Sequence, residues 1–273
     1  MKLGISSYTY TWSVGIPGFF PDRPWDEKKL VSQTVQLGLE CLQIADNLPL
    51  HTFNEARLNE LKKTAAGAGV ELEVGARRMT LQHLLEYIRI ADLLSASLLR
   101  FVIEGEGFTP TVPEVVEIIR KALPELEKGG ISLALENHEG LKTEEFEEII
   151  RDVDSEHVGI CLDTVNSMGA GEGIETVVRL LAPYTKNLHL KEFRAIRKPH
   201  MMGFTIEGCP FGTGQLPVEW ILAQLGPGCR SAILEQWTPP ETYLKNTLAR
   251  ERQWAEESID YLKKHFFIKN QSK

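Results

Sequence analysis

The sequence predicts an α/β fold, a single (β/α)8 barrel or TIM barrel that forms one domain over residues 1–273. β-rich runs and amphipathic helical segments alternate eight times along the chain, and no change in composition marks a second domain. Parallel strands joined by helices must be covered on both faces or close on themselves, and eight strands suit closure. A doubly wound open sheet is the main alternative.

The expected strands are short runs of β-branched and aliphatic residues, bounded by glycine, proline or polar residues. Their apolar character indicates strands that are buried on both faces, as in a parallel barrel. In chain order we expect them at residues 3–7, 41–45, 71–76, 98–103, 131–136, 158–163, 187–192 and 232–236.

Helical segments follow these strands, and several begin at a recognisable residue. Asp26, Thr80 and Thr143 stand where a side-chain oxygen can cap the first turn. Pro113 and Pro217 suit first-turn positions, where a proline has no hydrogen bond to lose. The helices are expected near residues 26–37, 54–66, 80–95, 112–128, 143–151, 174–182, 217–225 and 241–264.

Two long segments depart from the regular pattern, residues 8–25 after the first strand and 193–217 after the seventh. In a barrel both lie on the C-terminal rim, where loops shape and cover a site. Trp12 and Arg194 lie in them, and Asn47 follows the second strand, so these three are candidate substrate contacts. Packing on the barrel or exposure to solvent is the alternative for each.

The composition favours a soluble globular protein, with 42% hydrophobic and 25% charged residues. A net charge of −8 argues against nucleic acid as a partner. No apolar run reaches the length of a membrane span, and the N-terminal residues do not resemble a signal peptide. The cysteines are widely spread and form no CxxC motif, so we expect a cytoplasmic protein that works in reducing surroundings.

Ionisable side chains stand at the ends of four consecutive expected strands: Glu136, Asp163, His189 and Glu235. The carboxyl ends of barrel strands converge on one face, and the alternation of side chains allows all four to point inward. Such a group is costly to bury without a cation, so the sequence predicts one divalent metal ion. Oxygen ligands with one nitrogen favour Mn²⁺, with Mg²⁺, Co²⁺ and Zn²⁺ as alternatives, and no thiol is expected beside them in a position that demands zinc.

Five segments, taken in order, resemble the xylose-isomerase-like TIM-barrel superfamily of sugar isomerases and epimerases over nearly the whole chain: ALENHEG, GICLDTVNSMG, LHLKEF, GTGQLP and ILEQW. The resemblance implies that Glu136, Asp163, His189 and Glu235 hold one divalent metal, and that Glu136 and Glu235 transfer protons. Thr213 stands where many relatives carry an acidic residue, so it receives no role.

The leading hypothesis is a metal-dependent isomerase or epimerase of a small sugar or sugar derivative. A metal that chelates two adjacent oxygens stabilises the enediolate formed when a neighbouring carbon loses a proton. Glu136 and Glu235 then act as the proton-transfer pair.

The alternative is a decarboxylase or dehydratase of a sugar-derived keto-acid, using His138, Lys191 and Arg100. A lysine beside a metal site can hold a substrate carboxylate or an enolate, and a buried arginine can meet an anionic group. The offsets of His138 and Lys191 resemble 3-dehydroshikimate dehydratases, and the segments YTYTWSVGIPG and DNLPLH resemble decarboxylases of the 3-oxo-isoapionate type.

Structural roles stay open for the same three residues. His138 can orient a metal ligand, Lys191 can neutralise Glu192 or Glu104, and Arg100 can pair with Glu73 on the neighbouring strand.

Two further classes of protein are alternatives. A DNA-repair endonuclease of the same superfamily needs more strand-end histidines and a basic face, and a catalytically silent barrel needs no substrate at all. We expect a small-molecule partner, with a homodimer as an open possibility.

Overall fold

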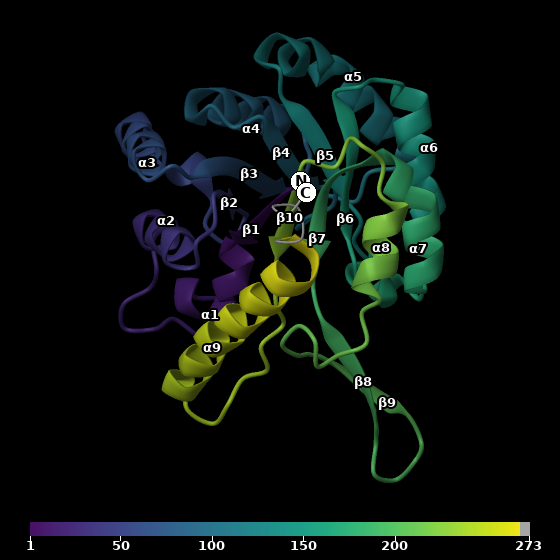
Figure 1. The fold of residues 1–273 in the computed structure, drawn as a ribbon. Coiled ribbons are helices and arrows are strands. Elements are labelled where there is room, and N and C mark those ends of the chain that lie inside the picture. Colours follow the sequence, from purple (N-terminus) through teal and green to yellow (C-terminus); the bar gives the residue numbers. More distant parts are fainter. Residues whose placement is uncertain (268–273) are drawn as a thin grey trace, which may run out of the picture.

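In the computed structural model, which describes residues 1–267, parallel strands close into a barrel surrounded by helices (Figure 1). The strand order around the barrel is β1-β10-β7-β6-β5-β4-β3-β2, which confirms the predicted fold class. The strands are β1 Lys2–Ser6, β2 Cys41–Ile44, β3 Glu71–Arg77, β4 Leu98–Val102, β5 Ser132–Glu136, β6 Val158–Asp163, β7 Thr185–Leu190 and β10 Ser231–Leu234.

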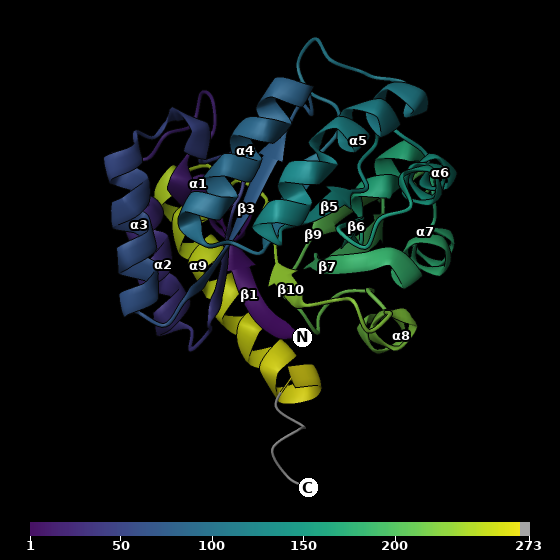
Figure 2. The same cartoon turned by 90° about the horizontal axis from the view of Figure 1, so that it is seen from above.

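The helices that cover the barrel lie within three residues of the expected ranges at either end: α2 Glu27–Gln36, α3 Glu55–Gly67, α4 Leu81–Leu94, α5 Val112–Gly129, α6 Thr143–Val153, α7 Ile174–Leu181, α8 Val218–Gln224 and α9 Leu244–Leu262 (Figure 2). Asp26 and Thr80 cap their helices as predicted, through bonds from the backbone N–H of Lys29 and His83. None of the helices within residues 1–267 is both long and apolar enough to cross a bilayer.

Two predicted helix starts differ from the structure. Thr143 is the first residue of α6 rather than its cap, and its hydroxyl donates to Glu172, which lies between β6 and α7. Pro217 precedes α8 as its N-cap residue instead of lying in the first turn. Both differ by one position, which is within the usual variation of helix boundaries.

The barrel interior contains a polar layer below the strand ends, formed by Gln43, Glu73, Asn187 and Ser231. All four side chains are buried, and hydrogen bonds join them across strands β2, β3, β7 and β10. Buried polar groups are tolerated when each has a partner, and such networks specify a single arrangement of the core. The strand ends therefore lie above an ordered polar layer.

The first long segment folds onto the barrel rim as η1 Ser7–Tyr10 and α1 Thr11–Val14. Glu251 of α9 holds it in place, because its carboxylate accepts hydrogen bonds from the backbone N–H groups of Trp12 and Ser13 and from the Ser13 hydroxyl.

The second long segment contains an antiparallel hairpin that the sequence did not predict, β8 Phe193–Arg197 and β9 Phe204–Gly208. It projects away from the barrel in Figure 1, and its two strands pair with each other.

Candidate active site

The four strand-end residues meet at one face of the barrel, because β10, β7, β6 and β5 are successive neighbours. The Nδ1 atom of His189 lies 3.6 Å from Glu136 Oε2, 3.8 Å from Asp163 Oδ2 and 3.6 Å from Glu235 Oε2. All four side chains are buried. We call Glu136, Asp163, His189 and Glu235 the strand-end cluster.

The cluster has the donor set that a divalent cation needs. Gln43 Oε1 accepts a hydrogen bond from His189 Nε2 at 2.8 Å, which leaves the Nδ1 lone pair facing the carboxylates. His189 Nδ1 has no hydrogen-bond partner among residues 1–267. One atom each from Asp163, His189 and Glu235 lies within 4.8 Å of the others. A lone pair and carboxylates that face one another at these distances are suited to holding a metal ion.

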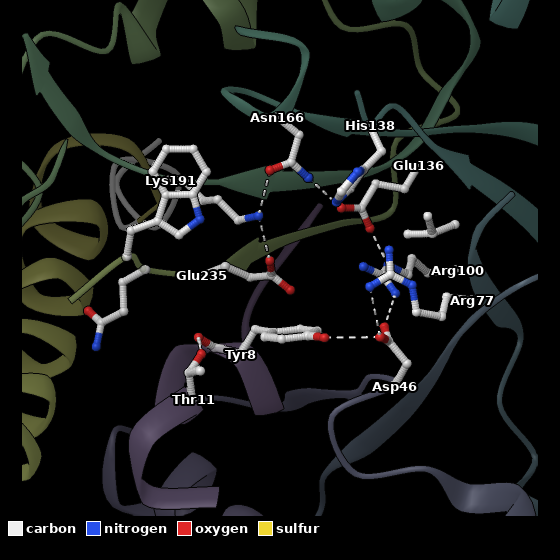
Figure 3. Close-up of a pocket in the computed structure, with 13 residues that line it drawn as sticks. Tyr8, Thr11, Asp46, Arg77, Arg100, Glu136, His138, Asn166, Lys191 and Glu235 are labelled. Carbon is white, nitrogen blue, oxygen red and sulfur yellow. Dashed lines mark hydrogen bonds and ion pairs between the residues drawn. The ribbon is translucent and has the colours of Figure 1, made fainter. Parts of the chain in front are cut away.

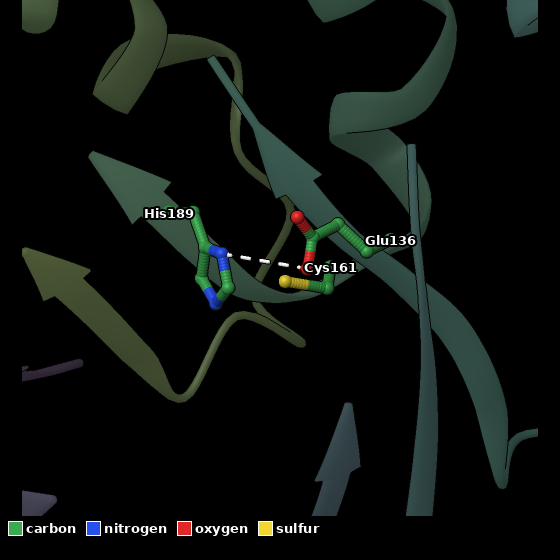
Figure 4. Close-up of side chains that lie close together, drawn as sticks. All are labelled: Glu136, Cys161 and His189. Carbon is green, nitrogen blue, oxygen red and sulfur yellow. Dashed lines mark ion pairs between the residues drawn. The ribbon is translucent and has the colours of Figure 1, made fainter. Parts of the chain in front are cut away.

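A thiol lies beside the cluster, contrary to the expectation from the sequence. Cys161 Sγ lies close to Glu136 and His189, because it precedes Asp163 by two residues on β6 and points to the same side (Figure 4). It donates a hydrogen bond to Asn187 Oδ1 at 3.0 Å. Burial raises the pKa of the Cys161 thiol well above its usual range, so the thiol is protonated in the metal-free protein.

Lys191 directs its ammonium group into the cluster. Nζ lies 2.7 Å from Asp163 Oδ2, 3.0 Å from Glu235 Oε2 and 3.2 Å from Asn166 Oδ1. Burial by itself lowers the pKa of Lys191, but the charges of Asp163 and Glu235 outweigh it and hold that pKa above its usual range. Lys191 is therefore a cation. Its partners are Asp163 and Glu235, so the alternative in which it neutralises Glu192 or Glu104 is wrong.

Arg100 is bound on two sides by carboxylates. Its Nε donates to Glu136 and its Nη1 donates to Asp46 Oδ1 at 2.6 Å, with a further bond to the Ala76 carbonyl. The alternative pairing with Glu73 is wrong, because Gly75 is the β3 residue beside Arg100 and Glu73 lies lower, in the polar layer.

A cavity of about 230 Å³ opens above the cluster (Figure 3). Tyr8 closes one side and donates from its hydroxyl to Asp46 Oδ2 at 3.0 Å, while Asn166 donates to Glu136 Oε1 at 2.9 Å. The lining includes five of the predicted residues, Arg100, Glu136, His138, Lys191 and Glu235, together with Tyr8, Thr11, Asp46, Arg77, Val102, Asn166, Gln236 and Trp237.

Sequence reasoning missed Arg77 and Asn166 as residues of the cavity. Arg77 is the last residue of β3, and Asn166 follows the end of β6 by three residues. A position at a strand end was the available signal, but neither residue belongs to the run of ionisable ends on consecutive strands.

His138 lines the cavity beside Glu136. Its Nδ1 lies 3.2 Å from Glu104 Oε1 and 2.5 Å from Glu139 Oε2. Burial lowers the pKa of His138, but the interaction with Glu104 and the charge of Glu136 outweigh this effect. The pKa of His138 therefore lies above its usual range. The imidazole therefore has a tendency to carry a proton.

Three expected substrate contacts, Trp12, Asn47 and Arg194, are absent from the described lining of this cavity. Trp12 Nε1 donates to the Thr238 carbonyl at 2.9 Å, and Asn47 Nδ2 donates to the Ser7 carbonyl at 3.1 Å. Arg194 lies on the β8–β9 hairpin. Contact of these three residues with substrate stays a prediction.

Residues 31–265 match the family model described as xylose isomerase-like TIM barrel. The chain belongs to the xylose isomerase-like TIM-barrel family. Within this family, 3-oxo-isoapionate decarboxylase of Pectobacterium atrosepticum is 32% identical over 266 residues, which cover 96% of this chain and 95% of that protein. The uncharacterized protein YihM of Escherichia coli is 25% identical over 144 residues, 51% of this chain and 43% of YihM.

Solved structures share the barrel at lower identity. D-psicose 3-epimerase of Clostridium cellulolyticum has a TM-score of 0.70 and 18% identity, covering 96% of this chain and 98% of its own. The probable 3-DHS dehydratase AsbF of Bacillus anthracis has a TM-score of 0.64 and 13% identity, covering 93% and 98%. At these identities the likeness establishes the xylose isomerase-like fold, in which isomerases and lyases both occur.

Proposed function

We propose that this protein is a metal-dependent decarboxylase of a sugar-derived 3-oxo acid. The observation that carries the proposal is the buried ammonium group of Lys191, which lies between Asp163 and Glu235 at the floor of the cavity. The relative that is 32% identical over nearly the full chain is a 3-oxo-isoapionate decarboxylase, which supports the same class. This ranking reverses the order that the sequence alone favoured.

The surroundings of the two glutamates support decarboxylation over epimerisation. An epimerase needs both Glu136 and Glu235 as proton-transferring bases, one on each side of the reacting carbon. Here Glu136 accepts from Arg100 and Asn166, and Glu235 is paired with Lys191 and accepts from the Ser6 hydroxyl at 2.8 Å. Burial raises the pKa of Glu235, but the charges of His189 and Lys191 outweigh it and hold that pKa below its usual range, which weakens Glu235 as a base. Loss of CO₂ requires no base.

A divalent cation held by the strand-end cluster would supply Lewis-acid polarisation of the substrate keto group, and the oxygen-rich donor set favours Mn²⁺. The bond between the carboxylate carbon and its neighbour then breaks, CO₂ leaves, and the electron pair stays on the remaining substrate. Lys191 stabilises the negative charge that develops on the keto oxygen. His138, which tends to carry a proton, returns one to the carbon that lost CO₂.

An epimerase is the second candidate, because Glu136 and Glu235 both lie in the cluster, each 3.6 Å from His189 Nδ1. In that reaction Lys191 would act only as a charge beside the metal. The two reactions differ in their products and in the source of the proton.

The test is an assay of CO₂ release from 3-oxo-isoapionate with Mn²⁺, run beside deuterium incorporation from solvent into D-psicose. We expect metal-dependent CO₂ release, and no exchange into the ketose. Lys191→Met should lower kcat about 100- to 1,000-fold, the usual loss when one charge-stabilising donor is removed. Lys191→Arg, which keeps the charge, should retain more activity. Deuterium exchange into D-psicose without any CO₂ release would favour the epimerase instead.

A further inference from the structure

We propose that Gln43 fixes the tautomer of His189 and thereby sets the affinity of the strand-end cluster for its divalent cation, with Glu73 holding the Gln43 amide in the required orientation. The inference rests on the metal site of the proposed function, and it assigns positioning roles to two residues of the barrel interior. Neither residue lines the cavity above the strand-end cluster.

The orientation of the Gln43 amide follows from its neighbours. Its Nε2 lies 3.0 Å from Glu73 Oε2 and 3.1 Å from Asn187 Oδ1, and it donates to both. Glu73 Oε2 also accepts from Asn187 Nδ2 at 3.4 Å, so the NH₂ end of the Gln43 amide faces an acceptor. Gln43 Oε1 is then the atom that faces His189 Nε2, at 2.8 Å.

The rest of the polar layer agrees with this direction of donation. Asn187 Nδ2 donates to Ser231 Oγ at 2.7 Å, which leaves the Ser231 hydroxyl hydrogen free to donate to Glu73 Oε1. On the other side, Cys161 Sγ donates to Asn187 Oδ1. Asn187, Ser231 and Gln43 can each accept as well as donate, whereas Glu73 accepts from all three of them. Glu73 therefore anchors the direction of the whole chain of hydrogen bonds.

Metal binding depends on which ring nitrogen of His189 carries the hydrogen. A carbonyl oxygen can bond to His189 Nε2 only if that nitrogen is protonated, so the neutral ring has its lone pair on Nδ1. Nδ1 is the atom that faces Glu136, Asp163 and Glu235. The opposite tautomer would place an N–H where the cation must bind. Groups that orient a ligating histidine typically contribute about 10- to 100-fold to metal affinity.

The experiment compares Gln43→Met, which has a similar length but accepts no comparable hydrogen bond, with the unaltered protein. Binding of Mn²⁺ is measured by calorimetry, and the tautomer of His189 by ¹⁵N chemical shifts in metal-free protein at alkaline pH, where the ring is neutral. We expect the dissociation constant for Mn²⁺ to rise about 10- to 100-fold and the share of Nδ1–H tautomer to increase. Gln33→Met, at another buried glutamine on α2, is the matched control and should change neither.

Glu73→Gln tests the anchor and covers the case in which Gln43→Met does not fold. An amide at position 73 can donate to Gln43, so the Gln43 amide can turn, and both readouts should move in the same direction by a smaller amount. Unchanged Mn²⁺ affinity in both variants, or weaker affinity without a change of tautomer, overturns the inference. Absence of Mn²⁺ binding to the unaltered protein overturns the metal site of the proposed function, while the tautomer measurement still reports on Gln43.

Discussion

Arg77 is the cavity cation that the carboxylates of the site engage least. Arg100 donates to Glu136 and Asp46, and Lys191 is held by three oxygen atoms of the site. Arg77 makes one long contact, 3.9 Å from Nη1 to Asp46 Oδ2, and its side chain is 43% exposed. A guanidinium group with free donors is well suited to binding a carboxylate in a bidentate manner.

We therefore expect Arg77→Met to weaken binding of the proposed substrate, a sugar-derived 3-oxo acid. A hydrogen bond to a charged group contributes about 1.5–3 kcal/mol, which corresponds to a KM roughly 10- to 100-fold higher with a smaller change in kcat. Steady-state kinetics of CO₂ release separate the two constants. Arg78→Met is the control at the neighbouring position, since Arg78 does not line the cavity above the strand-end cluster. An unaltered KM in Arg77→Met would remove Arg77 from substrate binding.

At the scale of the element, the rim segment η1–α1 depends on one buried carboxylate of α9. Burial raises the pKa of Glu251 to about 7, and the hydrogen bonds from Ser13 and Trp12 lower it only in part. Between its unfolded value near 4.5 and about 7, the folded protein binds a proton that the unfolded chain has released. The contribution of Glu251 to stability is therefore largest at acid pH and declines as pH rises through this window.

The expected size of this effect is roughly 3 kcal/mol at most, from about 1.4 kcal/mol per unit of pKa. Urea unfolding of metal-free protein between about pH 5 and about pH 8 should show it as a loss of unfolding free energy in the native chain relative to Glu251→Gln. Glu256→Gln, at an exposed position of the same helix, should keep the native profile. Parallel profiles for the native chain and Glu251→Gln would show that Glu251 does not titrate in this range.

The β8–β9 hairpin could not be predicted from the periodicity of the sequence. Its strands run from a buried residue at the barrel end to exposed residues at the turn, and they pair only with each other among residues 1–267. A two-stranded ribbon buries little apolar surface, so its residues need not show the strong periodicity of a core strand.

At the scale of the whole molecule, metal binding should stabilise the fold. Three buried carboxylates converge on His189, and a dication among them offsets their mutual repulsion. A ligand at about 100 times its Kd stabilises the native state by about 2.7 kcal/mol, or roughly 5–10 °C in Tm for a chain of this size. Thermal unfolding in Mn²⁺ and in EDTA measures the difference, which Asp163→Asn should reduce. Equal Tm values in the native protein would count against the metal site.

Much of this architecture was determined by the sequence alone. Strand and helix periodicity is local, so the eight βα units and their order could be predicted from short windows. The positions of Glu136, Asp163, His189 and Glu235 at strand ends are local as well, and closure of the barrel requires such ends to converge. The family resemblance rested on these same segments and was confirmed.

Only the tertiary structure decided which groups in the site are occupied and which are free. Arg100 meets Glu136 and Asp46, 36 and 54 residues away, because strand register places Gly75 beside it and leaves Glu73 one layer lower. Lys191 reaches Asp163 and Glu235 across two neighbouring strands for the same reason. Hydrogen bonds and ion pairs act over a few ångströms in space, whereas sequence patterns report only what is near along the chain.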